Sequence, residues 1–150
     1  MSSKKYIHYG HKYFDMELFN WITNRGLYVK PIGGLWASPV DASFGWKDWN
    51  RDSRFVTCND ENSFTFTLSD EARVLVIDNN DLLKGLPQRE EEFALDTWCL
   101  LDFEKLSEDY DAIELVLSSD GRLYWSLYGW DCDCILVMNP NVVVEVERNA

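Results

Sequence analysis

Basic side chains are scarce in this sequence. Its 150 residues contain 14 lysines and arginines against 26 aspartates and glutamates, which gives a formal net charge of −12 at pH 7. A surface of this charge repels phosphate backbones and gains little from the release of counterions. The composition therefore argues against broad nucleic-acid binding and favours a protein partner with a basic surface.

Long apolar runs are absent as well. No stretch approaches the ~18 consecutive apolar residues that a membrane-spanning helix needs. Residues 1–5 are followed by Tyr6, Ile7, His8 and Tyr9, whereas a secretory signal continues into an apolar core. We therefore expect a cytoplasmic protein that does not use a membrane.

Cysteine is limited to four positions, which are Cys58, Cys99, Cys132 and Cys134. This number is consistent with reduced thiols in the cytoplasm. Cys132 and Cys134 are separated by one residue, so a bridge between them would be strained and we expect two free thiols. The neighbouring Asp131 and Asp133 oppose formation of a thiolate, which argues against a nucleophilic cysteine.

The two histidines could join these cysteines in a zinc site. His8, His11, Cys132 and Cys134 have the side-chain types that zinc prefers. The Cys-x-Cys spacing is tighter than the usual gap of about two to four residues, and His11 is expected in a surface loop. Zinc therefore remains a fallback interpretation, and no metal is expected.

Aromatic residues, in contrast, are plentiful. The sequence has 7 Trp, 7 Tyr and 8 Phe within a hydrophobic content of 46%. Such a composition argues against disorder, and a chain of this length can bury roughly 68–70% of its unfolded surface. We expect one domain that spans residues 1–150.

The hydrophobic pattern predicts many strands and few helices. Alternating or continuous apolar residues predict strands at 4–9, 35–37, 63–68, 72–77, 111–117, 122–128, 134–138 and 142–147. Helical spacing predicts helices at 16–25, 41–49 and 102–110, with a helical turn at 78–86 and a loop at 51–62. This distribution is typical of an α+β domain with a mainly antiparallel sheet.

The stretch 33–46 combines a glycine pair, a short strand, a turn at Ser38 and Pro39, and a predicted helix with aromatic residues. Glycine lets a ligand approach the backbone closely, and aromatic planes on both arms of the turn can stack on a flat ring. Trp36 and Trp46 are the two candidate planes. Burial in the core is the alternative for both residues.

Three motifs whose residues could bind a ligand or take part in catalysis lie far apart in the sequence. They are His8-Tyr9-Gly10, then Gly34-Leu35-Trp36-Ala37-Ser38-Pro39 followed by Asp41-Ala42-Ser43-Phe44-Gly45-Trp46, and finally residues 131–140, an acidic entry into a late strand. In this order they resemble the motifs of ADP-ribosyltransferases of the diphtheria-toxin and poly(ADP-ribose) polymerase type. The resemblance implies a split β-sheet core with a few short helices, and NAD as the substrate.

The resemblance also implies a role for each matching residue. His8 would hydrogen-bond the ribose next to nicotinamide, and the backbone of Tyr9 and Gly10 would hold the nicotinamide amide. Trp36 stands where the family usually has Tyr, and together with Trp46 it would sandwich the nicotinamide ring. The implied NAD-binding set is His8, Tyr9, Gly10, Trp36, Ser38 and Trp46.

The glutamate that this family places at the start of a late strand has no direct counterpart. The matching position falls on or beside Cys134, and the nearest carboxylates belong to Asp133 and Asp131. A bulge at 132–134 could compensate for the shorter aspartate side chain and bring Asp133 into place. We favour Asp133 over Asp131 as the catalytic partner of His8, because it is closer to the expected site. Glu114 is a third candidate, although an outward-facing strand position is the stronger expectation for it.

Two hypotheses for the function follow. The first is a small enzyme, an NAD-dependent mono-ADP-ribosyltransferase that modifies a protein acceptor with a basic surface. Such a protein could serve as a phage or bacterial effector that inactivates a host or defence protein. The second is a catalytically inactive, acidic binding protein that inhibits a basic, nucleic-acid-handling partner by stoichiometric association. The missing glutamate and the net charge of −12 motivate the second hypothesis.

Overall fold

The computed structural model describes residues 4–25, 29–53, 60–90 and 97–149. The strands are β1 (Tyr6–Tyr9), β2 (Leu35–Pro39), β3 (Ser63–Leu68), β4 (Val74–Ile77), β5 (Ala112–Leu115), β6 (Cys134–Val137) and β7 (Val143–Arg148). The α-helices are α1 (Trp46–Ser53), α2 (Phe103–Asp109) and α3 (Leu123–Ser126). The 3-10 helices are η1 (Met16–Leu18), η2 (Asp60–Asn62), η3 (Asn80–Gly85), η4 (Leu117–Ser119) and η5 (Pro140–Val142).

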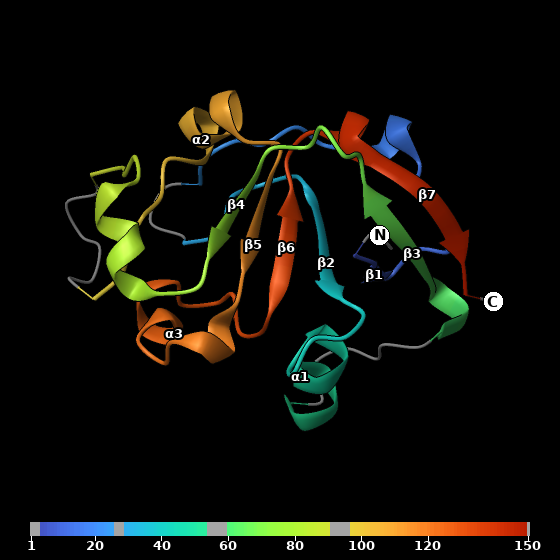
Figure 1. Ribbon diagram of the computed structural model, residues 1–150, viewed down its shortest axis with the longest axis horizontal. Helices are drawn as coiled ribbons and strands as arrows, with labels where there is room; N and C mark the ends of the chain where they lie inside the picture. The colour runs from blue at the N-terminus through green and yellow to red at the C-terminus, as the bar shows by residue number, and fades with distance from the viewer. Residues whose placement is uncertain (1–3, 26–28, 54–59, 91–96, 150) are drawn as a thin grey trace.

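The seven strands form one sheet in the order β4-β5-β6-β2-β1-β3-β7 (Figure 1). Strands β4 and β5 are parallel, and the other neighbouring pairs are antiparallel. The fold is therefore α+β with few short helices, but the sheet is mixed, which corrects the expectation of a mainly antiparallel one. The parallel pair exists because the chain crosses over between β4 and β5 through η3 and α2.

The sheet has two parts that meet at a short seam. Strands β1 and β2 share two residue pairs, Tyr6 with Pro39 and Ile7 with Ser38, whereas β1 and β3 share four. In Figure 1, β3 and β7 run obliquely to β4, β5 and β6. The sheet therefore bends at the place where the first and second sequence motifs lie side by side.

Side chains alternate between two hydrophobic clusters, one on each face of the sheet. On β2, Leu35 and Ala37 belong to the cluster that also contains Phe64 and Phe66, which we call the inner cluster. Trp36 packs against the other cluster, which we call the helix-side cluster because α2, α3 and η3 contribute to it. This alternation follows from the two-residue repeat of a strand.

The helix predicted at 16–25 is wrong beyond its first turn. Only Met16–Leu18 forms a 3-10 turn, and residues 19–25 form no helix. The Asn20 carbonyl accepts a hydrogen bond from the Gly34 N–H at 2.8 Å, and Thr23 and Ile32 exchange two backbone hydrogen bonds. Pairing with residues 32–34 therefore uses backbone groups that a helix would need internally.

The strand predicted at 122–128 is also wrong, because helix α3 occupies this segment. Leu123 and Leu127 are buried, while Tyr124, Trp125 and Tyr128 are exposed. Buried residues four positions apart fit a helix, and the Leu127 N–H donates to the Leu123 carbonyl at 2.8 Å. The helix predicted at 41–49 is displaced too, since α1 begins at Trp46 and strand β2 continues through Pro39.

Several other predictions agree with the structure. Strand β3 has the predicted bounds, and β1, β4, β5, β6 and β7 lie within or next to their predicted ranges. Helix α2 lies within the predicted 102–110, with Asp102 as its N-cap accepting a hydrogen bond from the Lys105 N–H. The loop predicted at 51–62 is wrong at both ends, because residues 51–53 belong to α1 and residues 60–62 form η2, and the part between them, including Cys58, lies outside the described residues.

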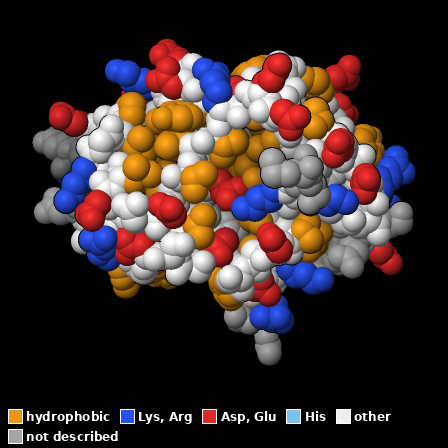
Figure 2. Space-filling view, viewed as in Figure 1, with side chains coloured by type: hydrophobic (Ala, Val, Ile, Leu, Met, Phe, Trp, Pro, Cys, Tyr) orange, Lys and Arg blue, Asp and Glu red, His pale blue; other side chains and the backbone are white. Residues whose placement is uncertain are grey.

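Hydrophobic side chains gather over β4, β5 and β6 on the face shown in Figure 2, among scattered charged side chains. Val76 on β4 is 44% exposed. None of the helices formed by the described residues is both long and apolar enough to cross a membrane.

Candidate functional site

The structure brings the three motifs together at the seam of the sheet, because β1, β2 and β6 are neighbours. The His8 ring Nδ1 lies 2.7 Å from the Trp36 carbonyl oxygen, which links the first motif to the second. The Ser38 hydroxyl donates to the Asp133 carbonyl at 2.9 Å, and the Asp133 N–H donates to the Phe44 carbonyl at 2.8 Å. The second motif is thus tied to both of the others.

The His8 ring is engaged through both of its nitrogens. A carbonyl oxygen only accepts, so His8 Nδ1–H donates to Trp36 and the neutral ring leaves Nε2 as an acceptor. Nε2 lies 2.9 Å from His11 Nδ1, which then donates. Burial lowers the pKa of His8 below its ordinary value, His11 lowers it further, and the hydrogen bond to Trp36 opposes the shift. A ribose hydroxyl would have to replace His11 to reach this ring.

His8 also borders a pocket of about 260 Å³. Leu35 and Phe64 of the inner cluster line the same pocket, together with Phe14 and Leu18. The His8 and Phe64 rings lie 5.1 Å apart between centroids. The imidazole therefore faces the inner side of the sheet.

Trp36 and Trp46 lie on the opposite, helix side of the sheet. Their ring centroids are 6.5 Å apart and the ring planes are at 85°. A ring held between two others needs two nearly parallel planes, so these tryptophans form a corner instead of the expected sandwich. Trp130 packs edge-on against Trp36 at 4.8 Å, and its own indole is fully buried.

A lysine fills this corner. Lys30 Nζ lies over the Trp36 ring at 5.0 Å from its centroid and over the Trp46 ring at 4.6 Å. Both distances are within the range of cation–π attraction. Burial lowers the pKa of Lys30, and the acidic groups around it, among them Asp131, oppose this shift.

The remaining predicted NAD-binding groups have structural partners. The Gly10 N–H donates to the Asn62 carbonyl at 2.8 Å. The Ser38 hydroxyl, besides donating to Asp133, accepts from the Trp46 N–H at 2.9 Å and so fixes the start of α1. Tyr9 pairs with Ser63 of β3. Thus the backbone of the motifs converges, while the His8 ring and the tryptophan corner lie on opposite faces.

The glycine pair serves close packing. Gly33 has a φ of +91°, and a Cβ there would lie 2.6 Å from the carbonyl oxygens of Asn20 and Trp21. Gly34 has a φ of +79°, and its Cβ would lie 2.5 Å from a methyl group of Leu136. Protein atoms therefore occupy the space that the sequence suggested for a ligand.

Asp133 has a structural role. Its side chain is buried, and its two carboxylate oxygens accept from the Ser118 N–H at 3.0 Å and from the Ser118 hydroxyl at 2.9 Å. The carboxylate therefore points toward η4. The geometry does not favour Asp133 over Asp131 as the catalytic carboxylate.

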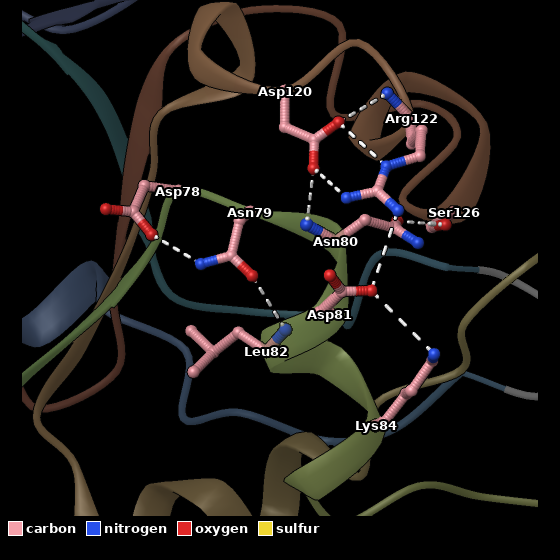
Figure 3. Close-up of polar contacts among 9 residues, drawn as sticks. All are labelled: Asp78, Asn79, Asn80, Asp81, Leu82, Lys84, Asp120, Arg122 and Ser126. Carbon is pink, nitrogen blue, oxygen red and sulfur yellow. Dashed lines mark hydrogen bonds and ion pairs between the residues drawn. The ribbon is translucent and has the colours of Figure 1, made fainter.

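A polar network beside Ser118 holds η4 in place. Asp120 accepts from the Asn80 N–H at 2.8 Å and from the Arg122 guanidinium at 2.8 and 3.1 Å (Figure 3). The bonds to Arg122 hold the pKa of Asp120 well below its usual range. Arg122 also pairs with Asp81 at 3.5 Å. These contacts attach the turn between η4 and α3 to η3 and so position the donors that hold Asp133.

Asp131 is the better candidate for a reactive carboxylate. Its backbone has a φ of +60°, an arrangement that costs a non-glycine residue about 1–3 kcal/mol. The side chain is half-buried, and burial raises its pKa, while the charge of Lys30 opposes that shift. Asp131 and the lysine that fills the tryptophan corner therefore influence each other electrostatically.

Glu114 is buried, contrary to the expectation of an outward-facing residue. The Tyr6 hydroxyl donates to one of its oxygens at 2.5 Å, and Lys4 Nζ pairs with the other at 2.8 Å. Burial, and then the bond to Glu114, raises the pKa of Tyr6 far above its ordinary value. Strand pairing places Glu114 opposite Ile135 of the inner cluster, away from Asp131.

The cysteines form no bridge or metal site within the described part of the chain. Cys99, Cys132 and Cys134 are free and buried. Burial raises the pKa of Cys134, which disfavours a thiolate. In the four described ranges, no group of three or more His, Cys, Asp or Glu side chains is placed to hold a metal ion.

Sequence reasoning missed Lys30 and Ser118. Lys30 precedes Pro31 in a segment without a motif, and Ser118 lies in an ordinary turn signal. The side-chain types give no signal of either role, because both depend on partners at least six residues away in sequence.

Comparison of the chain with protein-family models, with curated proteins and with solved structures found no match.

Proposed function

We propose that this protein is an NAD-dependent mono-ADP-ribosyltransferase that modifies a protein acceptor with a basic surface. The observation that carries the proposal is the convergence of the three motifs on adjacent strands, tied by the His8–Trp36 and Ser38–Asp133 hydrogen bonds. The bend of the sheet at the β1–β2 seam supports it too, because the resemblance implies a split sheet.

The chemistry requires a fixed negative charge near the reacting ribose carbon. As the bond between nicotinamide and ribose breaks, its electron pair leaves with the nicotinamide nitrogen and positive charge develops on the ribose. A nucleophilic side chain of the acceptor then bonds to that carbon and releases its proton. Asp131 is the residue we assign to stabilise the developing charge, because it is half-buried and interacts electrostatically with Lys30, which lies over the faces of Trp36 and Trp46.

The test uses purified protein with NAD labelled in the adenylate, in the presence of cell extract. We expect label on protein and release of nicotinamide. Asp131→Asn should lower the rate by about a hundredfold or more, since it removes the charge and keeps the shape. Asp70→Asn, at an exposed turn, is the matched control. If neither labelled protein nor released nicotinamide is found, the proposal fails.

A second candidate is a catalytically inactive, acidic binding protein. Two observations favour it: Ser118 engages both carboxylate oxygens of Asp133, and Lys30 occupies the corner where a nicotinamide ring would stack. The net charge of −12 suits a basic, nucleic-acid-handling partner.

His8→Ala and Trp36→Ala separate the two functions. An enzyme should lose its biological effect in both variants while the folded structure persists by circular dichroism. A stoichiometric inhibitor should retain its effect in both. Full retention would lead us to abandon the enzymatic proposal.

A further inference from the structure

The two histidines meet where β1 ends. His8 Nε2 lies 2.9 Å from His11 Nδ1, although one ring belongs to the strand and the other to the loop that follows it. Gly10 lies between them with a φ of +119°, a conformation that glycine adopts without strain. Its N–H donates to the Asn62 carbonyl at 2.8 Å, which attaches the turn to the neighbouring segment. The backbone therefore directs two imidazole nitrogens toward the same point.

The ring of His8 is held as the ring of a metal ligand usually is. A histidine that ligates a metal almost always donates its other ring N–H to a carboxylate, a backbone carbonyl or water, which fixes the tautomer and the orientation of the ring. His8 Nδ1 lies 2.7 Å from the Trp36 carbonyl oxygen. Phe64, its partner on β3, packs against the same ring at 5.1 Å between centroids. The lone pair of Nε2 is therefore fixed in direction and points at His11.

The cysteines that the sequence grouped with these histidines cannot join them. Cys132 and Cys134 belong to the helix-side cluster, whereas the His8 ring faces the inner side of the sheet. Among the described residues, no set of three or more His, Cys, Asp or Glu side chains is placed around one ion. An ion bound here thus has two protein ligands and keeps open positions.

The open positions have room for water. Both histidines line the pocket of about 260 Å³ on the inner side of the sheet. Asp15 and Asn20 line the same pocket, and their side-chain oxygens can accept hydrogen bonds from water bound to the ion. The carboxylate of Asp15 also adds a negative charge that favours a cation in the pocket.

We infer that His8 Nε2 and His11 Nδ1 bind one divalent transition-metal ion such as Zn²⁺, with water molecules as the remaining ligands. Imidazole nitrogen suits zinc, copper and nickel, whereas magnesium and calcium prefer oxygen. The inference is independent of the proposed function, because it requires neither NAD nor a transfer reaction.

The observed geometry needs only a small adjustment. Tetrahedral zinc with Zn–N bonds of about 2.0–2.1 Å holds two nitrogens about 3.3 Å apart, so the present separation of 2.9 Å must widen slightly. His11 is exposed and can make this shift. The ion takes the place of the proton on His11 Nδ1, and His11 takes up a proton at Nε2 from water. The number of protons on the pair therefore does not change.

Calorimetric titration of the protein, prepared without a histidine tag, tests the site with Zn²⁺ as the probe. We expect one site in the wild type that a tenfold excess of Mg²⁺ does not occupy. His11→Ala should weaken zinc binding by at least about tenfold, because loss of an outer-shell partner alone costs about 10–100-fold. His11 is exposed, so its replacement leaves the sheet intact.

Two variants serve as controls for zinc held by other groups. Glu17→Gln removes an exposed carboxylate near the pocket, and Cys58→Ser removes a thiol outside the described residues. Both should bind zinc like the wild type. Thermal unfolding followed by circular dichroism establishes that each variant is folded.

Nitrogen-15 spectra of the imidazole rings supply a measurement on the wild type itself. The chain contains two histidines, so each ring gives its own set of signals. Zinc should shift the signals of His8 Nε2 and His11 Nδ1 and leave His8 Nδ1 protonated. The inference is overturned if zinc leaves both rings unchanged, if His11→Ala binds zinc as tightly as the wild type, or if Cys58→Ser abolishes binding.

Discussion

Replacing Asp133 by alanine should weaken the fold, because this buried carboxylate joins β6 to η4. The Ser118 N–H and hydroxyl donate to its two oxygens at 3.0 and 2.9 Å. A hydrogen bond to a charged group contributes about 1.5–3 kcal/mol. Ser118 is exposed, so water can take up its donors once the carboxylate is gone. We therefore expect Asp133→Ala to lower the free energy of unfolding by about 2–4 kcal/mol, less than two full bonds would give.

Milder changes should give smaller effects in a defined order. In Asp133→Asn, the amide oxygen can accept from the Ser118 N–H, and the amide nitrogen can donate to the Ser118 hydroxyl. The cost should then be about 1 kcal/mol. Ser118→Ala removes only the hydroxyl bond and should cost about 1–2 kcal/mol.

Urea unfolding followed by tryptophan fluorescence measures these differences, with the slope m expected to stay constant. The double variant Asp133→Ala/Ser118→Ala should be less destabilised than the sum of the single variants, because both remove the same bond. An unfolding midpoint of Asp133→Ala equal to that of the wild type would refute the structural role. Together with a loss of transferase activity, it would return Asp133 to the role of the carboxylate that stabilises the developing charge.

Two further predictions concern the core and the seam. Trp130→Ala should lower the free energy of unfolding, measured by urea titration, by about 3–5 kcal/mol, because the indole is fully buried. Trp130→Phe should lower it much less, because the buried indole N–H has no hydrogen-bond partner among the described residues. Equal losses in the two variants would contradict this prediction. The pKa of His8 in the folded protein lies below its unfolded value of 6.5. Below about pH 6.5 the unfolded chain therefore binds more protons than the folded chain, and the free energy of unfolding decreases toward pH 5. In His8→Gln this decrease should be smaller, and identical pH dependence in both proteins would count against the assignment.

The sequence was sufficient for elements with one clear hydrophobic repeat. The strict alternation at 63–68 gave β3 with the correct bounds, and the spacing of Phe103 and Leu106 behind the Asp102 cap gave α2. Local pattern failed at 16–25, where the spacing is helical but Asn20 and Thr23 pair with residues 32–34. Such pairing depends on a segment about ten residues away, so a local hydrophobic repeat cannot predict it.

For the candidate site, the sequence located the three motifs and the two aromatic residues of the corner. It did not reveal that the His8 ring faces the inner cluster while Trp36 faces the helix side. That outcome follows from the register of β1 against β2, because a strand sends successive side chains to opposite faces. Register is set by pairing between distant segments.

The sequence by itself determined an acidic, aromatic-rich α+β chain with its chemical motifs in a fixed order. Only the tertiary structure decided which carboxylates are engaged and which cation fills the corner. Ser118 reaches Asp133 across 15 residues, Tyr6 reaches Glu114 across 108, and Lys30 reaches both tryptophans from a segment without a motif. The physical reason is that charge and hydrogen bonding act through space, so the role of a polar side chain is fixed by the groups that folding places around it.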